Sequence, residues 1–176
     1  MFEATNYERL PVDYEISPDS KIRLIVTSNK RMNFYKNIFL KKGIEYVDGR
    51  FCILVFLDDY LFGFLIFDVI RYGMDQEKAV RGVYMLSDFV VNSRIKRLSK
   101  LLLLVTKTEE FRRMLSKKFL STADFILTTA FTDKPVSMKY RGMYKLLKRG
   151  DGFLQYVTDC GTISLSEVIL TWKRKK

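Results

Sequence analysis

The sequence predicts an α/β (α+β) fold in which a central mixed, mostly antiparallel sheet is flanked by helices. Apolar runs of strand length alternate with segments that have the spacing of apolar residues typical of helices. The chain is 48% hydrophobic and 14% aromatic, without a low-complexity tract or repeat. A chain of 176 residues can bury a substantial core, so we expect residues 1–176 to form a single domain.

The first predicted elements are a strand at Lys21–Thr27 and a helix within the segment SNKRMNFYKNIFLKKG that follows it. The spacing places Phe34, Ile38 and Phe39 on one side of this helix. Gly43 is the expected helix end, because glycine is common just beyond the last turn.

The next unit is a hairpin of two apolar strands, Phe51–Leu57 and Tyr60–Phe67, joined by Asp58-Asp59. Both strands are apolar on both faces, which is typical of central strands covered on each side. The run approaches membrane-spanning length, but each aspartate at its middle would cost roughly 2.5–3.5 kcal/mol there. We therefore expect a soluble hairpin and no membrane partner.

The middle of the chain predicts a strand at Val83–Val91 and another at Asp124–Phe131. Between them, Leu98–Val105 has helical spacing but also fits a buried strand, and we favour the helix. Thr106–Glu109 resembles a capping box that opens a further helix ending near Phe119.

The segment AFTDKPVSMKYRGMYKLLKRG interleaves tyrosines with lysines and arginines. Pro135 suits the first turn of a helix and Gly150 suits its end. Helical spacing would place one set of residues on an apolar face: Val136, Tyr140, Met143, Tyr144 and Leu147. It would place a second set on a basic face: Arg141, Lys145 and Lys148.

The last predicted elements are a strand at Phe153–Thr158 and a helix that runs toward the final TWKRKK. Ser164–Glu167 matches a capping box for this helix.

Positive charge is concentrated in the second half of the chain. Residues 1–93 contain 12 Lys and Arg against 13 Asp and Glu, a net charge of −1, whereas residues 94–176 contain 19 against 7, a net charge of +12. Such a field attracts polyanions through neutralised phosphates and released counterions. We expect nucleic acid, an anionic cofactor or an acidic surface as a partner; the alternative is that the charge serves only solubility.

Residue types that are missing exclude several kinds of chemistry. The sequence has no histidine, which excludes Ser-His-Asp and Cys-His nucleophiles, a histidine general base and the usual zinc ligand sets. No spacing of Asp, Tyr or Ser indicates a metal site. Cys52 and Cys160 lack CxxC spacing, and we expect them to be reduced in a cytosolic protein. The start, MFEATNYERL, has no features of a secretory signal, so the predicted localisation is cytoplasmic.

The order of elements from Phe51 to Thr158 resembles the GCN5-related N-acetyltransferase (GNAT) family. In that family a pyrophosphate loop of the form [QR]xxGx[GA] follows the strand that corresponds to Val83–Val91. Arg94-Ile-Lys-Arg97-Leu-Ser99 matches its first residue and carries Arg97 and Ser99 where the family has small residues. The resemblance implies acetyl-CoA or a related acyl donor, bound by Arg94, Arg97 and Ser99.

A second GNAT motif pairs an asparagine with a tyrosine seven residues later, and the tyrosine often protonates the leaving thiolate. Ser137 and Tyr144 have this spacing here. A tyrosine pKa of about 10 lies near that of a leaving thiolate. The resemblance implies a catalytic Tyr144, and the alternative is a tyrosine that only packs in the core.

The runs DFVV–RLSKL and TTAFTDKPVSMKYRGMYKLLKR also resemble Mom-type phage DNA-modification proteins, which are GNAT-like enzymes that modify adenine in DNA. This resemblance implies site roles for Asp88, Ser99, Ser137 and Tyr140; the alternative is that Asp88 ends a strand and caps the next turn and that the two serines are local caps. It implies that DNA phosphates are bound by a set of cations: Lys139, Arg141, Lys145, Lys148 and Arg149.

Three functions follow from these resemblances. The first is an acyltransferase acting on an exocyclic amino group of a DNA base, which would be flipped against an aromatic residue such as Phe131, Tyr140 or Tyr144. The second is a non-catalytic nucleic-acid-binding or inhibitory protein on a degenerate GNAT scaffold. The third is an acetyltransferase for a protein or a small amine.

Overall fold

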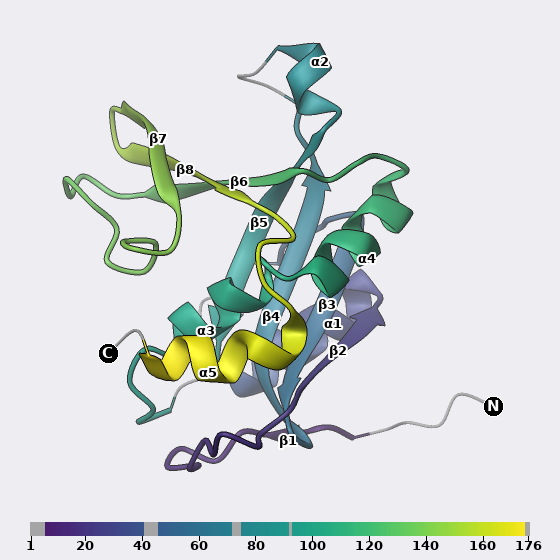
Figure 1. Cartoon of the computed structure of the whole chain (residues 1–176), viewed down its shortest axis with the longest axis vertical. Helices are drawn as coiled ribbons and strands as arrows, with labels where there is room; N and C mark the ends of the chain where they lie inside the picture. The colour runs from purple at the N-terminus through teal and green to yellow at the C-terminus, as the bar shows by residue number, and fades with distance from the viewer. Residues whose placement is uncertain (1–5, 41–45, 72–74, 92, 175–176) are drawn as a thin grey trace.

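One sheet organises the structure, a computed structural model that describes residues 6–40, 46–71, 75–91 and 93–174. Its strands follow the order β2-β3-β4-β5-β6-β8-β7, and β1 adds to β4 (Figure 1). Neighbours are antiparallel except for β5–β6 and β1–β4, which confirms the predicted fold class. The strands are β1 Glu8–Arg9, β2 Ile22–Thr27, β3 Phe51–Leu57, β4 Tyr60–Val69, β5 Gly82–Val90, β6 Phe125–Phe131, β7 Lys145–Gly150 and β8 Phe153–Asp159.

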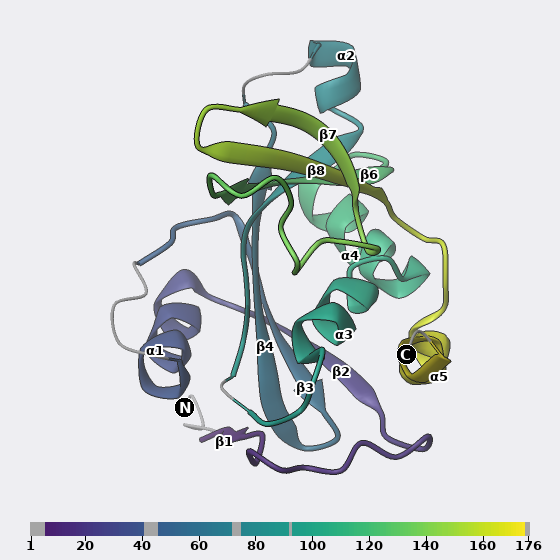
Figure 2. The same cartoon turned by 90° about the vertical axis from the view of Figure 1, so that its left-hand side faces the viewer.

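Helices cover both faces of the sheet. Figure 2 shows α1 on one face and α3, α4 and α5 on the other. The helices are α1 Asn29–Phe39, α2 Gln76–Ala79, α3 Leu98–Val105, α4 Glu109–Phe119 and α5 Val168–Arg174, with a 3-10 turn, η1, at Leu165–Glu167. None of the helices in the described part of the chain is long and apolar enough to span a membrane.

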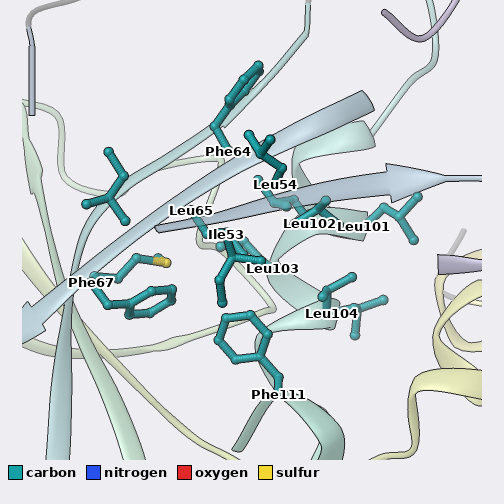
Figure 3. Packing of buried hydrophobic residues seen from close by; sticks show 14 of the residues in the cluster. Ile53, Leu54, Phe64, Leu65, Phe67, Leu101, Leu102, Leu103, Leu104 and Phe111 are labelled. Carbon is teal, nitrogen blue, oxygen red and sulfur yellow. The ribbon is translucent and has the colours of Figure 1, made fainter. Parts of the chain in front are cut away.

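The predicted central hairpin is confirmed. Every residue of β3 is buried, as are the residues of β4 from Leu61 to Asp68, because α1 lies on one face and α3 and α4 on the other. Figure 3 shows the leucines of α3 and Phe111 of α4 packed on these strands. Gly63 lets α3 approach closely, since a Cβ there would lie 2.5 Å from Cδ1 of Leu102.

The three apolar residues predicted on one side of α1 do not form its buried face, and of the three only Phe39 packs against the core. Phe34 and Ile38 are 55% and 53% exposed, whereas the buried residues are Met32, Asn33, Tyr35 and Lys36. The helix turns Asn33 inward because its side-chain amide donates to Val47 O (3.0 Å) and its Oδ1 accepts from Val47 N–H (3.2 Å). Gly43, the predicted helix end, lies outside the described residues.

The helices on the opposite face follow the predictions more closely. Leu98–Val105 is a helix, as favoured, and the helix ending at Phe119 is also present. Its cap is Thr108, whose hydroxyl accepts from Phe111 N–H (3.2 Å), and not Thr106. The C-terminal capping box is confirmed, with Ser164 N–H donating to Glu167 Oε2 (3.0 Å).

The prediction of a helix that begins near Pro135 and ends at Gly150 is wrong. The chain makes turns up to Met143 and then enters strand β7, which pairs with β8. One helical turn forms, in which Arg141 N–H donates to Ser137 O (3.0 Å). Gly142 then has φ of +75°, a left-handed conformation that ends helical continuation.

Candidate functional site

Strands β5 and β6 separate partway along their length. They pair in parallel only from Gly82–Phe125 to Met85–Thr128. Beyond this point β5 stays paired with β4 as far as Val90, and β6 with β8 as far as Phe131. Figure 1 shows β6 turning away from β5. We call the separated parts, Leu86–Val90 and Thr129–Phe131, the fork.

A bulge marks the closed end of the fork. The β4–β5 register shifts between Ile66 and Phe67, so that Leu86 has no direct partner. Further along, Val91 N–H donates to Phe62 O (2.9 Å). Because backbone groups alternate in direction along an antiparallel strand, the N–H and C=O groups of Asp88 and Val90 point away from β4 and into the fork.

Two side chains of the turn segment 132–144 reach the side of β5 that faces the fork. Tyr140 donates to Asp88 Oδ2 (2.9 Å), and Lys139 Nζ lies 2.7 Å from Asp88 Oδ1. The same ammonium donates to the backbone O of Asp88 (2.5 Å) and lies over the ring of Phe89. The structure therefore brings together Asp88 and Tyr140, two predicted site residues that are 52 positions apart.

Tyrosines pack behind this contact. The Tyr140 ring centroid lies 5.6 Å from that of Tyr144 and 4.9 Å from that of Tyr156. The Tyr144 hydroxyl lies 2.5 Å from Thr106 Oγ1, which itself donates to Leu103 O. Tyr144 therefore directs its hydroxyl at the end of α3 and Tyr140 directs its own at β5. Ser137 contributes a backbone N–H, which donates to the Tyr156 hydroxyl (2.8 Å).

Burial raises the pKa values of the acid–base groups in this cluster. Desolvation raises the pKa of Asp88, and the charge and hydrogen bond of Lys139 and the hydrogen bond of Tyr140 oppose the rise. Burial, followed by the negative charge of Asp88, raises the pKa of Tyr140, and burial raises that of Tyr144. Both tyrosines therefore stay protonated at neutral pH, while the Asp88 carboxyl is poised to take up a proton more readily than an exposed one.

The cysteines lie outside this cluster of interacting side chains. Cys52 and Cys160 are free and buried. Burial raises the pKa of Cys52 to about 11 and that of Cys160 to about 12. Neither thiol is ionised near neutral pH, so neither has the thiolate that a cysteine nucleophile requires.

The loop after β5 leads directly into α3. Arg97 has φ of +64° and ψ of 21°, the left-handed conformation that favours glycine. The loop therefore has a glycine-like backbone although the residue is arginine. The Arg97 carbonyl accepts from Trp172 Nε1 of α5 (3.0 Å), and helix geometry leaves the N–H groups of Leu98 and Ser99 without an intrahelical acceptor.

Cations gather beside this helix start. Lys96 and Arg97 of the loop and Lys173 and Arg174 of α5 line a hollow of about 770 Å3 together with Leu170 and Trp172. Sequence analysis identified Arg97 but missed the contribution of α5, for which the basic run TWKRKK was the available signal. The predicted Arg94 is exposed, and its N–H donates to Val12 O (2.6 Å).

A second hollow, of about 730 Å3, lies beside the closed end of the fork. Its lining comes from the end of β4, from β5, from the segment before β3 and from the β7–β8 hairpin, and it includes Asp48, Asp68, Tyr84, Leu86, Lys148 and Gln155. Leu86 faces the segment at Gly49, which Asn29 of α1 holds through Gly49 O (2.7 Å). Leu86 therefore lines the hollow from the face of the sheet on which α1 lies, the face opposite α3 (Figure 2). Sequence analysis did not identify it.

The predicted phosphate contacts fall into two groups. Arg141, Lys145, Lys148 and Arg149 are exposed in the turn and on β7. Lys139 instead turns inward to Asp88. Phe131, predicted as a stacking partner, is 85% exposed at the far end of β6.

Comparisons with known proteins agree with this architecture. No curated protein sequence matches the chain. Among solved structures, the chain is similar to apo FdhC, described as a nucleotide-linked sugar GNAT, with 9% identity, a TM-score of 0.50 and coverage of 88% of this chain and 92% of that one. It is also similar to the Campylobacter jejuni N-acetyltransferase PseH (12% identity, TM-score 0.46, 78% and 97% covered) and to Arabidopsis thaliana Naa50 in complex with a bisubstrate analogue (15%, 0.47, 78% and 98%). A family model described as the phage GNAT-like domain matches residues 19–176, and the chain therefore belongs to this phage GNAT-like family of the GNAT acetyltransferase superfamily.

Proposed function

We propose that the protein transfers an acyl group from an acyl-CoA thioester to an amine, and that transfer takes place in the fork. The observation that carries this proposal is that the part of β5 without a β6 partner is followed in the chain by the start of α3. Coenzyme A combines a pyrophosphate with an extended arm that contains amides. The edge of β5 offers partners for the amide-containing arm, and the start of α3 offers partners for the pyrophosphate.

The residues present fit this donor. A pyrophosphate suits the N–H groups of Leu98 and Ser99 at a helix N-terminus and the cations of the hollow beside them. Arg97 already has the conformation that a glycine would take, so its side chain replaces the small residue without a change of backbone. The Asp88 N–H and the N–H and C=O of Val90 would hold the amide-containing arm, since the Asp88 carbonyl already accepts from Lys139.

The thioester supplies an activated acyl group, and the chain's own residues supply the acid–base chemistry. The buried Asp88 carboxyl, whose pKa is raised, would accept a proton from the attacking amine. Tyr140 and Lys139 orient this carboxyl through hydrogen bonds to its two oxygens. Protonation of the thiolate by Tyr144 and a role for Ser137 remain predictions.

Binding of acetyl-CoA tests the proposal. Replacing Arg97 with glutamate places a negative charge beside the pyrophosphate, and we expect about 10- to 100-fold weaker binding, the worth of a charge-assisted hydrogen bond. Isothermal titration calorimetry measures this. Arg113→Glu, which makes the same charge change at an exposed site on α4, is the matched control and should bind as the wild type does. Equal affinity of both variants, or no binding by the wild type, would contradict the proposal.

We propose, further, that the acceptor is an exocyclic amino group of a DNA base. The exposed cations of β7 support this, because Lys148 also lines the hollow at the closed end of the fork. The aromatic residues Tyr84 and Phe153 line the hollow, and a flipped base stacks on aromatic rings. The net charge of +12 in residues 94–176 exceeds what a small acceptor requires.

Salt dependence of DNA binding tests this acceptor. Replacing Lys145, Lys148 and Arg149 with glutamine should reduce the slope of log K against log salt by about 0.9 for each phosphate contact that is lost. Fluorescence anisotropy with a labelled duplex measures the slope. The control replaces Arg113, Lys117 and Lys118 of α4 in the same way.

The results of the DNA-binding and acetyl-CoA-binding measurements together distinguish the candidate functions. Unchanged slopes in both variants would contradict a DNA acceptor bound at β7. DNA binding without acetyl-CoA binding would support a non-catalytic nucleic-acid-binding protein, and acetyl-CoA binding without DNA binding would support a protein or small amine as acceptor. Mass spectrometry of nucleosides from DNA of expressing cells should show a modified base.

A further inference from the structure

Lys139 carries a primary amine into the fork. Its Nζ donates to the backbone O of Asp88 at 2.5 Å and lies 2.7 Å from Asp88 Oδ1. It also lies 5.3 Å from the centroid of the Phe89 ring. The amine is therefore placed on the side of β5 that has no β6 partner, which is the surface proposed above for the acyl donor.

The amine is within reach of the closed end of the fork. Asp88 lies three positions beyond Met85, where the pairing of β5 with β6 ends, and a strand rises about 3.3 Å per residue. The distance along β5 is therefore about 10 Å at most. The Lys139 side chain is 29% exposed, and its flexible four-carbon stem lets the amine swing along the fork.

The group that would remove its proton is already in contact with it. The Asp88 carboxyl is buried, and its Oδ1 faces the ammonium while its Oδ2 accepts from Tyr140. Desolvation raises the pKa of this carboxyl, which favours uptake of a proton from a neighbour. The amine and its base are thus held together before any acceptor enters.

We propose that Lys139 is a self-acylation site, an inference that rests on the proposed function. In this reaction the ε-nitrogen forms an amide bond with the acyl carbon as the carbon–sulfur bond of the acyl-CoA thioester breaks, and the electron pair of that bond leaves with the sulfur. The ammonium loses two protons, of which Asp88 takes one and the leaving thiolate takes the other. The products are acyl-Lys139 and free coenzyme A.

Acylation also changes the fork itself. An acylated lysine has no charge, so it can no longer form the ion pair with Asp88. The buried carboxylate then loses its cation, which favours its protonated form. The modification would thereby alter the group that is proposed to act as the base.

Peptide mass spectrometry of the full chain incubated with acetyl-CoA tests this inference. We expect the mass of one acetyl group on Lys139 to accumulate at least about ten times faster than on Lys134 or Lys145, because proximity strongly favours a held amine over a free one. Lys134 and Lys145 are exposed and report the background reaction of acetyl-CoA with lysines. The rate should not depend on protein concentration, since the acceptor belongs to the same molecule.

Two variants and one binding measurement define the outcomes. Lys139→Arg keeps the cation and should abolish acetylation of this peptide, while Asp88→Asn should slow acetylation of Lys139 and change its pH profile. Acetyl-CoA binding by calorimetry without faster acetylation of Lys139 would overturn self-acylation and leave the proposed function standing. Absence of acetyl-CoA binding would overturn both.

Discussion

Replacing Lys139 with methionine is expected to destabilise the protein by about 3 kcal/mol near neutral pH, because it removes one partner of a buried ion pair. The side chain of Asp88 is only 9% exposed, and Lys139 is its partner at 2.7 Å. Methionine keeps much of the side-chain volume but leaves the carboxylate without a cation. The loss should lie at the lower end of the usual range for buried pairs because Lys139 itself is partly exposed.

The loss of stability caused by Lys139→Met should increase as the pH rises. Burial raises the folded-state pKa of Asp88, and removal of the ammonium raises it further. Below the unfolded-state pKa of about 3.9 the carboxyl is protonated in both states, so only the lost hydrogen bond to Asp88 O, worth about 1 kcal/mol, remains. As pH rises toward the folded-state pKa of the variant, the variant loses stability relative to the wild type.

Urea unfolding at pH values from about 3 to 8 measures this effect. The double variant Lys139→Met/Asp88→Asn should recover most of the stability at neutral pH, because it removes the unpaired charge as well. Equal destabilisation at every pH, or no recovery in the double variant, would show that the ion pair does not stabilise the fork.

Replacing Phe111 with alanine is expected to cost about 3–5 kcal/mol, the usual cost of removing a phenylalanine from a close-packed core. Phe111 is fully buried, and its ring centroid lies 5.4 Å from that of Phe67. Figure 3 shows the ring directed toward Phe67 and Leu103. The substitution therefore opens a cavity beneath α3, the helix that begins at the proposed donor site.

Phe131→Ala is the matched control, because the same atoms are removed from a side chain that is 85% exposed. We expect this variant to lie within about 0.5 kcal/mol of the wild type. Urea unfolding monitored by circular dichroism compares the two. A loss below about 1 kcal/mol for Phe111→Ala would mean that the interface between α4 and the sheet is not closely packed.

Sequence alone predicted the elements whose pattern has one physical explanation. A run that is apolar on both faces, as in Phe51–Leu57, fits a covered central strand and little else. The helix beginning at Glu109 has strong amphipathic spacing, and only its cap was placed two residues early. The buried face of α1 was not predicted, because Asn33 gains two hydrogen bonds to Val47 that apolar spacing does not reveal.

The turn segment was mistaken for a helix because its buried residues do follow helical spacing over one turn. Tyr140, Met143 and Tyr144 are buried, but Gly142 is left-handed, and the chain continues as β7. From there Leu147, predicted as part of the apolar face, is 49% exposed. Glycine within the pattern was the available signal, but alternation and helical periodicity overlap in so short a segment.

The candidate site was predicted only in part. Asp88 and Tyr140 were named by resemblance, and the structure places them in contact. The inward position of Lys139 could not be predicted, because it depends on the separation of β5 from β6 and on a turn that fills the gap. Arg97 was matched to a small-residue position of the family motif, and its backbone is indeed glycine-like, but no local pattern reveals that Trp172 binds its carbonyl.

The position of β7 has a consequence for how molecules of this protein meet one another. It is the last strand of the sheet, so one row of its backbone groups is open to any strand that another copy presents. Lys145, Lys148 and Arg149 place like charges along that open row, and their repulsion opposes sheet-to-sheet association. We therefore expect the cations proposed to bind DNA to oppose self-association as well, so that removing them should promote aggregation at low ionic strength.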